Sequence, residues 1–375
     1  MYKFSLQEYL GDLEKVVNID SGNFYAPGTN AVADFFVEKF RALGLSVEKK
    51  YKDGFEAAPF VTVRNSDSDR IDVLFLAHMD SVFPEGTAEK RPFRIDESGH
   101  VRGPGCVDCK GGCVAVYHLI RELVENNECR FNFCVALNSD EERGSKYSRE
   151  FIEELADKSD RCLVMEPGRP LQEYVDTRKS GANYTVKCHG IAAHSGVEPE
   201  KGASAILELS RLVPEIYKYF NLEEGTTVNI GRFTGGSDNG QVPDYAEFTL
   251  SLRCLHPERS EVIDAEIREM MKHPTDSRCT LELECRSFRP AMFPHEKTKE
   301  MLEIFSAIGD EMNYPVTYLT TGGGSDGNWV AHRGVATLDG CGPAGGCLHT
   351  EDEYLIKETV GTRIEILRRL LTKLY

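Results

Sequence analysis

Two neighbouring motifs constrain this chain more than any other feature. The first is an apolar run, Leu74-Phe-Leu-Ala-His78-Met-Asp80, and the second is a glycine-rich turn, Gly103-Pro-Gly-Cys-Val-Asp108-Cys-Lys-Gly-Gly112. The run predicts a buried strand that delivers His78 and Asp80 to its end, and the turn presents Asp108 just before a helix. Imidazole and carboxylate groups at such positions suit a borderline-soft divalent cation such as zinc.

The pattern of apolar residues predicts an α/β fold with a doubly wound mixed sheet. Strands are expected at residues 61–63, 73–77, 131–137 and 162–165, with helices between them. In such sheets, ligands bind beyond the carboxyl ends of the strands. After Pro170 the order becomes β-α-β-β-α-β, which resembles a ferredoxin-like insert. We therefore expect a discontinuous catalytic domain, residues 1–178 and 290–375, and an inserted α+β domain, residues 179–289.

Charge and composition exclude several classes of partner. A net charge of −17 argues against a nucleic-acid or anionic-membrane surface, because phosphate groups would be repelled. The chain has neither a basic start followed by an apolar stretch nor an apolar run near the roughly 20 residues that span a bilayer. We therefore expect a cytoplasmic protein, in which the 12 cysteines are mostly buried, reduced thiols.

Further acidic residues follow the next two predicted strands. Glu141 and Glu142 end one apolar run and Glu166 ends another. An isolated Asp-Glu-Glu is usually a solvated loop, but two adjacent carboxylates at a strand end can divide labour, one binding a metal and the other taking a proton. His349 alone would be an ordinary surface histidine. If Asp108 bridges two metals, each metal receives one histidine, one glutamate and the shared aspartate.

Asp80 is then expected to fix the tautomer of the imidazole at His78. The full set of predicted metal ligands is His78, Asp108, Glu142, Glu166 and His349.

Together, His78-Met-Asp80-Ser-Val, the Asp108 turn and Ser139-Asp-Glu-Glu-Arg-Gly-Ser resemble the co-catalytic zinc metallopeptidase superfamily. This superfamily includes acetylornithine deacetylase, succinyl-diaminopimelate desuccinylase, aminoacylase and carboxypeptidase G. The resemblance covers nearly the whole chain. The motifs most similar to the glutamate carboxypeptidase branch are Gly103-Pro-Gly, Ala193-His194-Ser-Gly, Pro199-Glu-Lys-Gly, Arg289-Pro290 and Gly322-Gly-Gly-Ser-Asp326.

The resemblance implies a catalytic domain of the zinc-peptidase (phosphorylase/hydrolase-like) fold with an inserted lid that also forms a homodimer. It implies two zinc ions, with cobalt or manganese left open, and Glu141 as the general base on a water that bridges them. By the same resemblance, His194 reaches the partner subunit's site and stabilises the oxyanion. One zinc would be held by His78, Asp108 and Glu166, and the other by Asp108, Glu142 and His349.

The expected reaction is hydrolysis of an amide or peptide bond next to a free α-carboxylate, as in a glutamate carboxypeptidase. An N-acyl amino acid deacylase or a di- or tripeptidase of the same superfamily is the alternative, so the substrate is a small peptide or an N-acyl amino acid. A carboxylate needs a fork-shaped cation or a nest of amides. Arg289 is the first candidate to bind the substrate carboxylate, and Arg253 and Asn229 are the next candidates. The backbone of Gly323 and Gly324 could form a cradle for it. Arg253 is equally well explained as a surface charge.

Two cysteines supply a rival hypothesis. Cys106-Val-Asp-Cys109 is a C-x-x-C motif, which is typical of a redox dithiol or of half a thiolate zinc site. The sequence contains no second C-x-x-C to complete a structural zinc site. Cys109 also stands where many members of the superfamily have a second acidic residue.

Overall fold

The computed structural model describes every residue except 1–2, 23 and 238–239. The chain divides into two compact units. The α/β unit comprises Met1–Asp176, Pro294–Thr320 and Ser325–Tyr375, and the inserted unit comprises Thr177–Phe293 and Thr321–Gly324. Among the described residues, no helix combines the length and apolar character that crossing a membrane requires.

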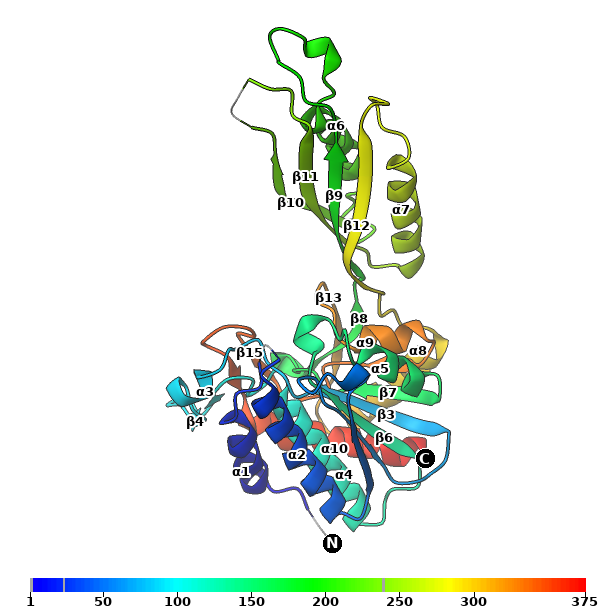
Figure 1. The fold of residues 1–375 in the computed structure, drawn as a ribbon. Helices are drawn as coiled ribbons and strands as arrows, with labels where there is room; N and C mark the ends of the chain where they lie inside the picture. Colours follow the sequence, from blue (N-terminus) through cyan, green and yellow to red (C-terminus); the bar gives the residue numbers. More distant parts are fainter. Residues whose placement is uncertain (1–2, 23, 238–239) are drawn as a thin grey trace. The chain divides into compact units, whose positions relative to one another are not determined.

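The α/β unit contains a six-stranded mixed sheet with the order β1-β2-β6-β3-β7-β14 (Figure 1). The pairs β1–β2 and β2–β6 are antiparallel, whereas β6, β3, β7 and β14 run parallel to their neighbours. The α/β class and the mixed sheet are as expected. The strands are β1 (Ser46–Lys50), β2 (Phe60–Arg64), β3 (Ile71–His78), β6 (Phe133–Asn138), β7 (Ser159–Val164) and β14 (Ala336–Leu338).

Helices cover both faces of this sheet because its central strands are apolar on both sides. In β3, Val73 and Phe75 belong to one buried cluster and Leu74 and Leu76 to another, as the alternation of side chains along a strand requires. The first cluster includes residues of α1 (Leu6–Val17), α2 (Ala26–Ala42), α4 (Lys110–Glu125), α8 (Glu296–Glu311) and α10 (Lys357–Leu374). The second includes residues of α5 (Arg149–Ala156) and α9 (Gly327–His332).

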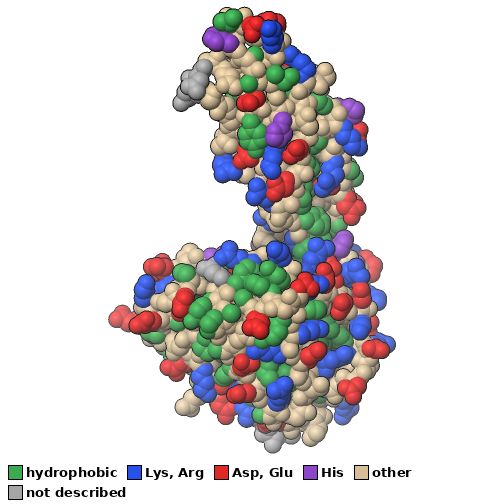
Figure 2. Space-filling view, in the orientation of Figure 1, with side chains coloured by type: hydrophobic (Ala, Val, Ile, Leu, Met, Phe, Trp, Pro, Cys, Tyr) green, Lys and Arg blue, Asp and Glu red, His purple; other side chains and the backbone are tan. Residues whose placement is uncertain are grey.

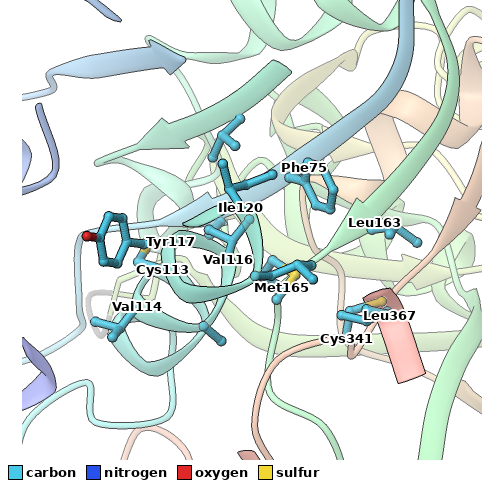
Figure 3. Packing of buried hydrophobic residues seen from close by; sticks show 14 of the residues in the cluster. Phe75, Cys113, Val114, Val116, Tyr117, Ile120, Leu163, Met165, Cys341 and Leu367 are labelled. Atoms are coloured by element: carbon cyan, nitrogen blue, oxygen red, sulfur yellow. The ribbon is translucent and has the colours of Figure 1, made fainter. Parts of the chain in front are cut away.

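Helix α4 packs tightly under the strand ends. Its Val116 and Ile120 lie in the same buried cluster as Phe75 and Leu163 of the sheet (Figure 3). A Cβ atom at Gly112 would collide with the carbonyl oxygen of Met165, so the first turn of α4 approaches the backbone beyond β7 more closely than a side chain allows. This approach brings the turn before α4 to the carboxyl end of the sheet.

Shorter elements complete the chain outside the two main sheets. They are η1 (Lys52–Gly54), α3 (Thr87–Lys90), β4 (Arg94–Ile95), β5 (Val101–Arg102), η2 (Glu141–Arg143), η3 (Pro170–Gln172), β8 (Glu173–Arg178), β13 (Thr317–Thr321), β15 (Gly345–Gly346) and β16 (Tyr354–Leu355).

The inserted unit has the expected ferredoxin-like order. Its sheet runs β10-β11-β9-β12 with every pair antiparallel, and residues of both helices share one buried cluster with it. The elements are β9 (Gly181–His189), η4 (Pro199–Lys201), α6 (Ala205–Tyr217), β10 (Thr227–Gly235), β11 (Tyr245–Arg253), α7 (Pro257–Met270) and β12 (Thr280–Arg289).

Candidate metal centre

Three parallel strands deliver acidic and imidazole side chains to one edge of the sheet. Strand β3 ends at His78, β6 leads into the η2 turn that contains Glu141 and Glu142, and β7 is followed by Glu166. Because these strands are parallel neighbours, their carboxyl ends meet at the same edge.

Asp108 lies between two imidazoles. Its Oδ1 is 3.2 Å from Nε2 of His78, and its Oδ2 is 3.3 Å from Nε2 of His349. Each imidazole has a second carboxylate beside it: Oε1 of Glu166 is 3.5 Å from Nε2 of His78, and Oε2 of Glu142 is 3.2 Å from Nε2 of His349. The structure thus brings all five predicted ligands together as two sets that share Asp108.

Asp80 contacts both His78 and the turn that carries Glu141 and Glu142. Its Oδ1 is 3.3 Å from Nδ1 of His78, and its two carboxylate oxygens accept the backbone N–H groups of Glu141 (3.3 Å) and Glu142 (3.0 Å). A proton on Nδ1 of His78 leaves the lone pair of Nε2 directed at Asp108, which is the tautomer that a metal ligand needs.

The site concentrates buried negative charge. Burial raises the pKa of Glu166 well above its ordinary value, and burial also raises the pKa of Glu142. Hydrogen bonding to Asp108 and Glu142 raises the pKa of His349 to about 10. Two imidazole nitrogens and three carboxylates, one of them the shared Asp108, are the donor chemistry of a pair of divalent cations. The residues therefore fit a two-metal centre.

The Cys109 thiol lies beside this centre. Donor atoms of His78, Cys109 and Glu166 lie within 4.8 Å of one another, as do those of His78, Asp108 and Glu142. The Cys109 thiol donates to the carbonyl of Met165 at 3.0 Å. All 12 cysteines are free thiols, and Cys106 belongs to neither of these metal-ligand groups.

Glu353 is a site residue that sequence reasoning missed. Its side chain is 2% exposed and accepts the backbone N–H groups of Gly105 (3.0 Å), Val107 (2.9 Å) and Asp108 (3.1 Å). It therefore fixes the turn that presents Asp108, and it lies in the same short segment as His349. The only signal in the sequence is an acidic residue four positions after a predicted ligand.

The arginines predicted to bind a carboxylate lie in the inserted unit. Burial and the neighbouring charge of Arg289 lower the pKa of Arg253. A Cβ atom at Gly324 would lie 2.8 Å from Cδ of Arg289, so this loop passes directly over that side chain. Arg178 donates to the carbonyl of Gly323 at 3.0 Å. The guanidinium groups of Arg178, Arg253 and Arg289 thus gather in one region with the glycine loop.

Asn229 and His194 occupy other parts of the inserted unit. Asn229 pairs with Ser251, two residues along the strands from the Thr227–Arg253 pair, and lines a cavity of about 220 Å³. His194 is exposed and lines a separate cavity of about 290 Å³, and its Nδ1 accepts the N–H of Gly196 at 3.2 Å.

Comparison with known proteins identifies the chain. The sequence pattern of peptidase family M20/M25/M40 matches residues 74–373. Carboxypeptidase G2 from Pseudomonas sp. strain RS-16 is 27% identical over 366 residues, covering 96% of this chain and 88% of the relative. Succinyl-diaminopimelate desuccinylase from Psychrobacter sp. strain PRwf-1 is 24% identical, covering 96% and 95%.

Solved structures share the fold. Aminopeptidase PepT from Bacillus cereus aligns with a TM-score of 0.80 at 22% identity over 98% of each chain. An M20 family metallo-carboxypeptidase from Sulfolobus solfataricus aligns with a TM-score of 0.71 at 17% identity over 97% of this chain and 98% of its own.

The family match together with the donor set defines a metal-dependent hydrolase. The chain belongs to peptidase family M20/M25/M40.

Proposed function

We propose that this protein is a di-zinc hydrolase that cleaves an amide or peptide bond next to a free α-carboxylate, as a glutamate carboxypeptidase does. The observation that carries the proposal is the Asp108 carboxylate between two imidazoles, each with its own glutamate. We assign His78, Asp108 and Glu166 to one zinc, and Asp108, Glu142 and His349 to the other. Bound zinc would polarise the scissile carbonyl and lower the pKa of water.

Glu141 is the general base in this proposal. Asp80 holds the Glu141 backbone beside the ligand Glu142, so its carboxylate is carried on the rim of the centre. Glu141 takes a proton from the attacking water as the oxygen bonds to the carbonyl carbon. It returns that proton to the nitrogen as the C–N bond breaks, so the products are a carboxylic acid and an amine.

The inserted unit supplies recognition. The forked guanidinium of Arg289 binds the α-carboxylate, with Arg253 beside it and Gly323 and Gly324 as a backbone cradle. His194 stabilises the oxyanion at the partner subunit's site in a homodimer formed through this unit. Asn229 has a supporting role in carboxylate binding. The cytoplasmic location stays a prediction.

A substrate panel tests the reaction and separates the alternatives. The protein is stripped with a chelator, reloaded with zinc, cobalt or manganese, and assayed with N-acyl amino acids, dipeptides, tripeptides and their carboxamide forms. A carboxypeptidase or deacylase cleaves substrates without a free amine, whereas a di- or tripeptidase requires one. Equal cleavage of free-acid and carboxamide substrates contradicts carboxylate recognition, and cleavage of none contradicts the proposed function.

Metal analysis distinguishes zinc binding by the Asp108 ligand set from zinc binding by the C-x-x-C cysteines. Glu142→Ala should lower bound zinc, because it removes one of the donors next to His349. Cys106→Ser should not, because that thiol lies 3.6 Å from the carbonyl of Val101 and belongs to neither metal-ligand group. Loss of metal in the cysteine variant alone would overturn the assignment.

A further inference from the structure

The motif Gly322-Gly-Gly-Ser-Asp326 ends in a buried aspartate that the proposed carboxylate cradle does not use. Asp326 directly precedes α9, where an aspartate commonly accepts backbone N–H groups of the helix that follows. Among the residues that the structure describes, its side chain forms no such capping bond. Acidic and basic side chains lie interspersed over the face of the α/β unit that Figure 2 shows, whereas Asp326 is only 4% exposed. A carboxylate withdrawn from water costs free energy unless hydrogen bonds compensate, so its contacts indicate its role.

Asp326 joins the two segments that flank the predicted base. Its Oδ2 accepts a hydrogen bond from Nδ2 of Asn138, and its Oδ1 accepts one from the hydroxyl of Ser145. Both donors are buried. Asn138 is the last residue of β6 and Ser145 follows the η2 turn, so the turn that carries Glu141 and Glu142 lies between them. One carboxylate therefore binds both ends of this turn.

The Asn138 end of the turn is also bound to strand β3. Asn138 pairs in register with His78, and its carbonyl accepts the N–H of Met79 at 2.7 Å. Its Nδ2 makes a second contact, 3.2 Å from the hydroxyl oxygen of Ser148. The residue that begins the turn is thus fixed to the strand that ends in a predicted metal ligand.

The Ser145 end of the turn has a backbone conformation that depends on its surroundings. Ser145 has a φ of 57°, in the left-handed region that few residues other than glycine adopt without support from neighbouring groups. Its N–H donates to the carbonyl of Asp140 at 2.8 Å, which closes the turn around Glu141 and Glu142. The hydroxyl bond to Asp326 holds the side chain of the same residue. Loss of this bond would allow the turn to relax.

We propose that Asp326 is a positioning residue for the reaction. Asp80 accepts the N–H groups in the middle of the turn, and Asp326 binds its two ends. Together they hold Glu141 at the place where it meets the attacking water and Glu142 beside the imidazole of His349. This inference rests on the proposed function and deepens it, because it assigns a role to a residue that contacts neither substrate nor metal.

The kinetic test uses the zinc-loaded protein and the best free-acid substrate of the panel. Asp326→Ala should lower kcat about 10²-fold, because small displacements of a reacting group have effects of this size, and Ser145→Ala should lower it about tenfold. KM should change little, because the proposed carboxylate site lies in the inserted unit. In Asp326→Asn the oxygen can still accept from Asn138 and the amide can donate to the hydroxyl of Ser145. This variant should retain about tenfold more kcat than Asp326→Ala.

Cobalt supplies a readout that does not depend on turnover. The protein is stripped with a chelator and titrated with Co²⁺, whose visible absorption reports the geometry of its ligands. In Asp326→Ala the spectrum should change and cobalt affinity should fall about 10- to 100-fold, because Glu142 is displaced from His349.

Asp12→Ala is the matched control for a loss of stability. Asp12 is also a buried carboxylate of the α/β unit, and it contacts the side chains of His118 and Lys39 rather than the turn. Rates are compared per folded molecule, with the folded fraction taken from circular dichroism. The control should keep the wild-type kcat and cobalt spectrum even though it unfolds at a lower urea concentration.

Each outcome decides the role of Asp326. A wild-type kcat and cobalt spectrum in Asp326→Ala overturns the inference, and so does an equal loss of kcat in Asp12→Ala. Asp326→Asn as impaired as Asp326→Ala would also contradict it, because the effect would then come from charge and not from the two hydrogen bonds. In these cases the proposed hydrolase function stands. Failure of the wild-type protein to cleave any substrate overturns the proposed function, and the cobalt spectra alone then decide whether Asp326 positions Glu142.

Discussion

Replacing Glu353 by glutamine tests whether the turn that presents Asp108 is held by a single buried carboxylate. One Glu353 oxygen accepts the N–H groups of Val107 and Asp108, and the other accepts the N–H of Gly105. Glutamine has the same shape but only one oxygen. Its amide group must face at least one backbone N–H, which then has no acceptor.

The magnitude follows from this count. In the better orientation the glutamine keeps two bonds and loses the one to Gly105, and a hydrogen bond to a charged group is worth about 1.5–3 kcal/mol. Burial raises the pKa of Glu353 to about 7, so the comparison is made at pH 8, where the carboxylate is charged. There the two remaining bonds become weaker, but the buried negative charge beside Asp108 is removed, and these two effects oppose each other. We expect the α/β unit to lose about 2 kcal/mol of unfolding free energy. Because outer partners of metal ligands are worth about 10- to 100-fold in affinity, zinc binding should weaken by a similar factor.

The assay is urea unfolding of the metal-free protein followed by tryptophan fluorescence. The chain has one tryptophan, Trp329, which is buried in the α/β unit and therefore reports on that unit alone. Zinc affinity is measured separately by competition with a chromogenic chelator. Glu358→Gln is the matched control, because Glu358 lies nearby in α10 with a side chain that is 63% exposed.

The reasoning is refuted if Glu353→Gln unfolds at the same urea concentration as the wild type and binds zinc equally well. An equal loss of stability in Glu358→Gln would also refute it, because the effect would then come from net charge.

Three further predictions concern the base, the carboxylate site and the response to acid. Glu141→Ala should retain zinc by metal analysis but lose about 10²–10⁴-fold in kcat, and substantial residual turnover would remove Glu141 from the role of base. Arg289→Lys should raise KM about tenfold for free-acid substrates, since the forked contact is lost, and unchanged kinetics would place recognition elsewhere. Burial disfavours the charged Asp12 carboxylate, but its hydrogen bonds with His118 and Lys39 outweigh burial and lower the pKa of Asp12. The charged carboxylate therefore stabilises the fold at pH values above its unfolded pKa of about 3.9, and this stabilisation is lost as the pH falls further. Urea unfolding at pH 7 and pH 3 should therefore show a smaller acid-induced loss of stability in Asp12→Asn than in the wild type, and parallel losses would contradict this.

The central strands could be predicted from the sequence because they are buried on both faces. The runs that form β3 and β6 are nearly continuous in apolar residues, and β7 ends in the apolar run Cys162-Leu-Val. Chemistry-bearing residues follow each of these three runs. By contrast, β1 reads Ser-Val-Glu-Lys-Lys and occupies an edge of the sheet, where only Val47 is apolar. An exposed edge strand carries no periodic apolar signal, and the sequence analysis missed it.

The candidate site also contains residues that could be predicted from the sequence and others that could not. The five donors that meet around Asp108 end strands or follow glycine turns, which sequence reasoning can recognise. The contacts of Glu353 depend on residues 245 to 248 positions away, and no local pattern encodes such a pairing.

The distribution of donors along the chain also sets the order in which the centre can be assembled during synthesis. His78, Asp108 and Glu166 all leave the ribosome before the inserted unit is made, whereas His349 and Glu353 follow it. Under the proposed assignment of ligands, a nascent chain therefore has every donor of one zinc while it still lacks His349, a ligand of the other zinc, and Glu353, which holds the turn of the shared Asp108. In that proposal, the second zinc site becomes complete only when the segment around residue 350 docks onto a sheet whose central strands were translated much earlier.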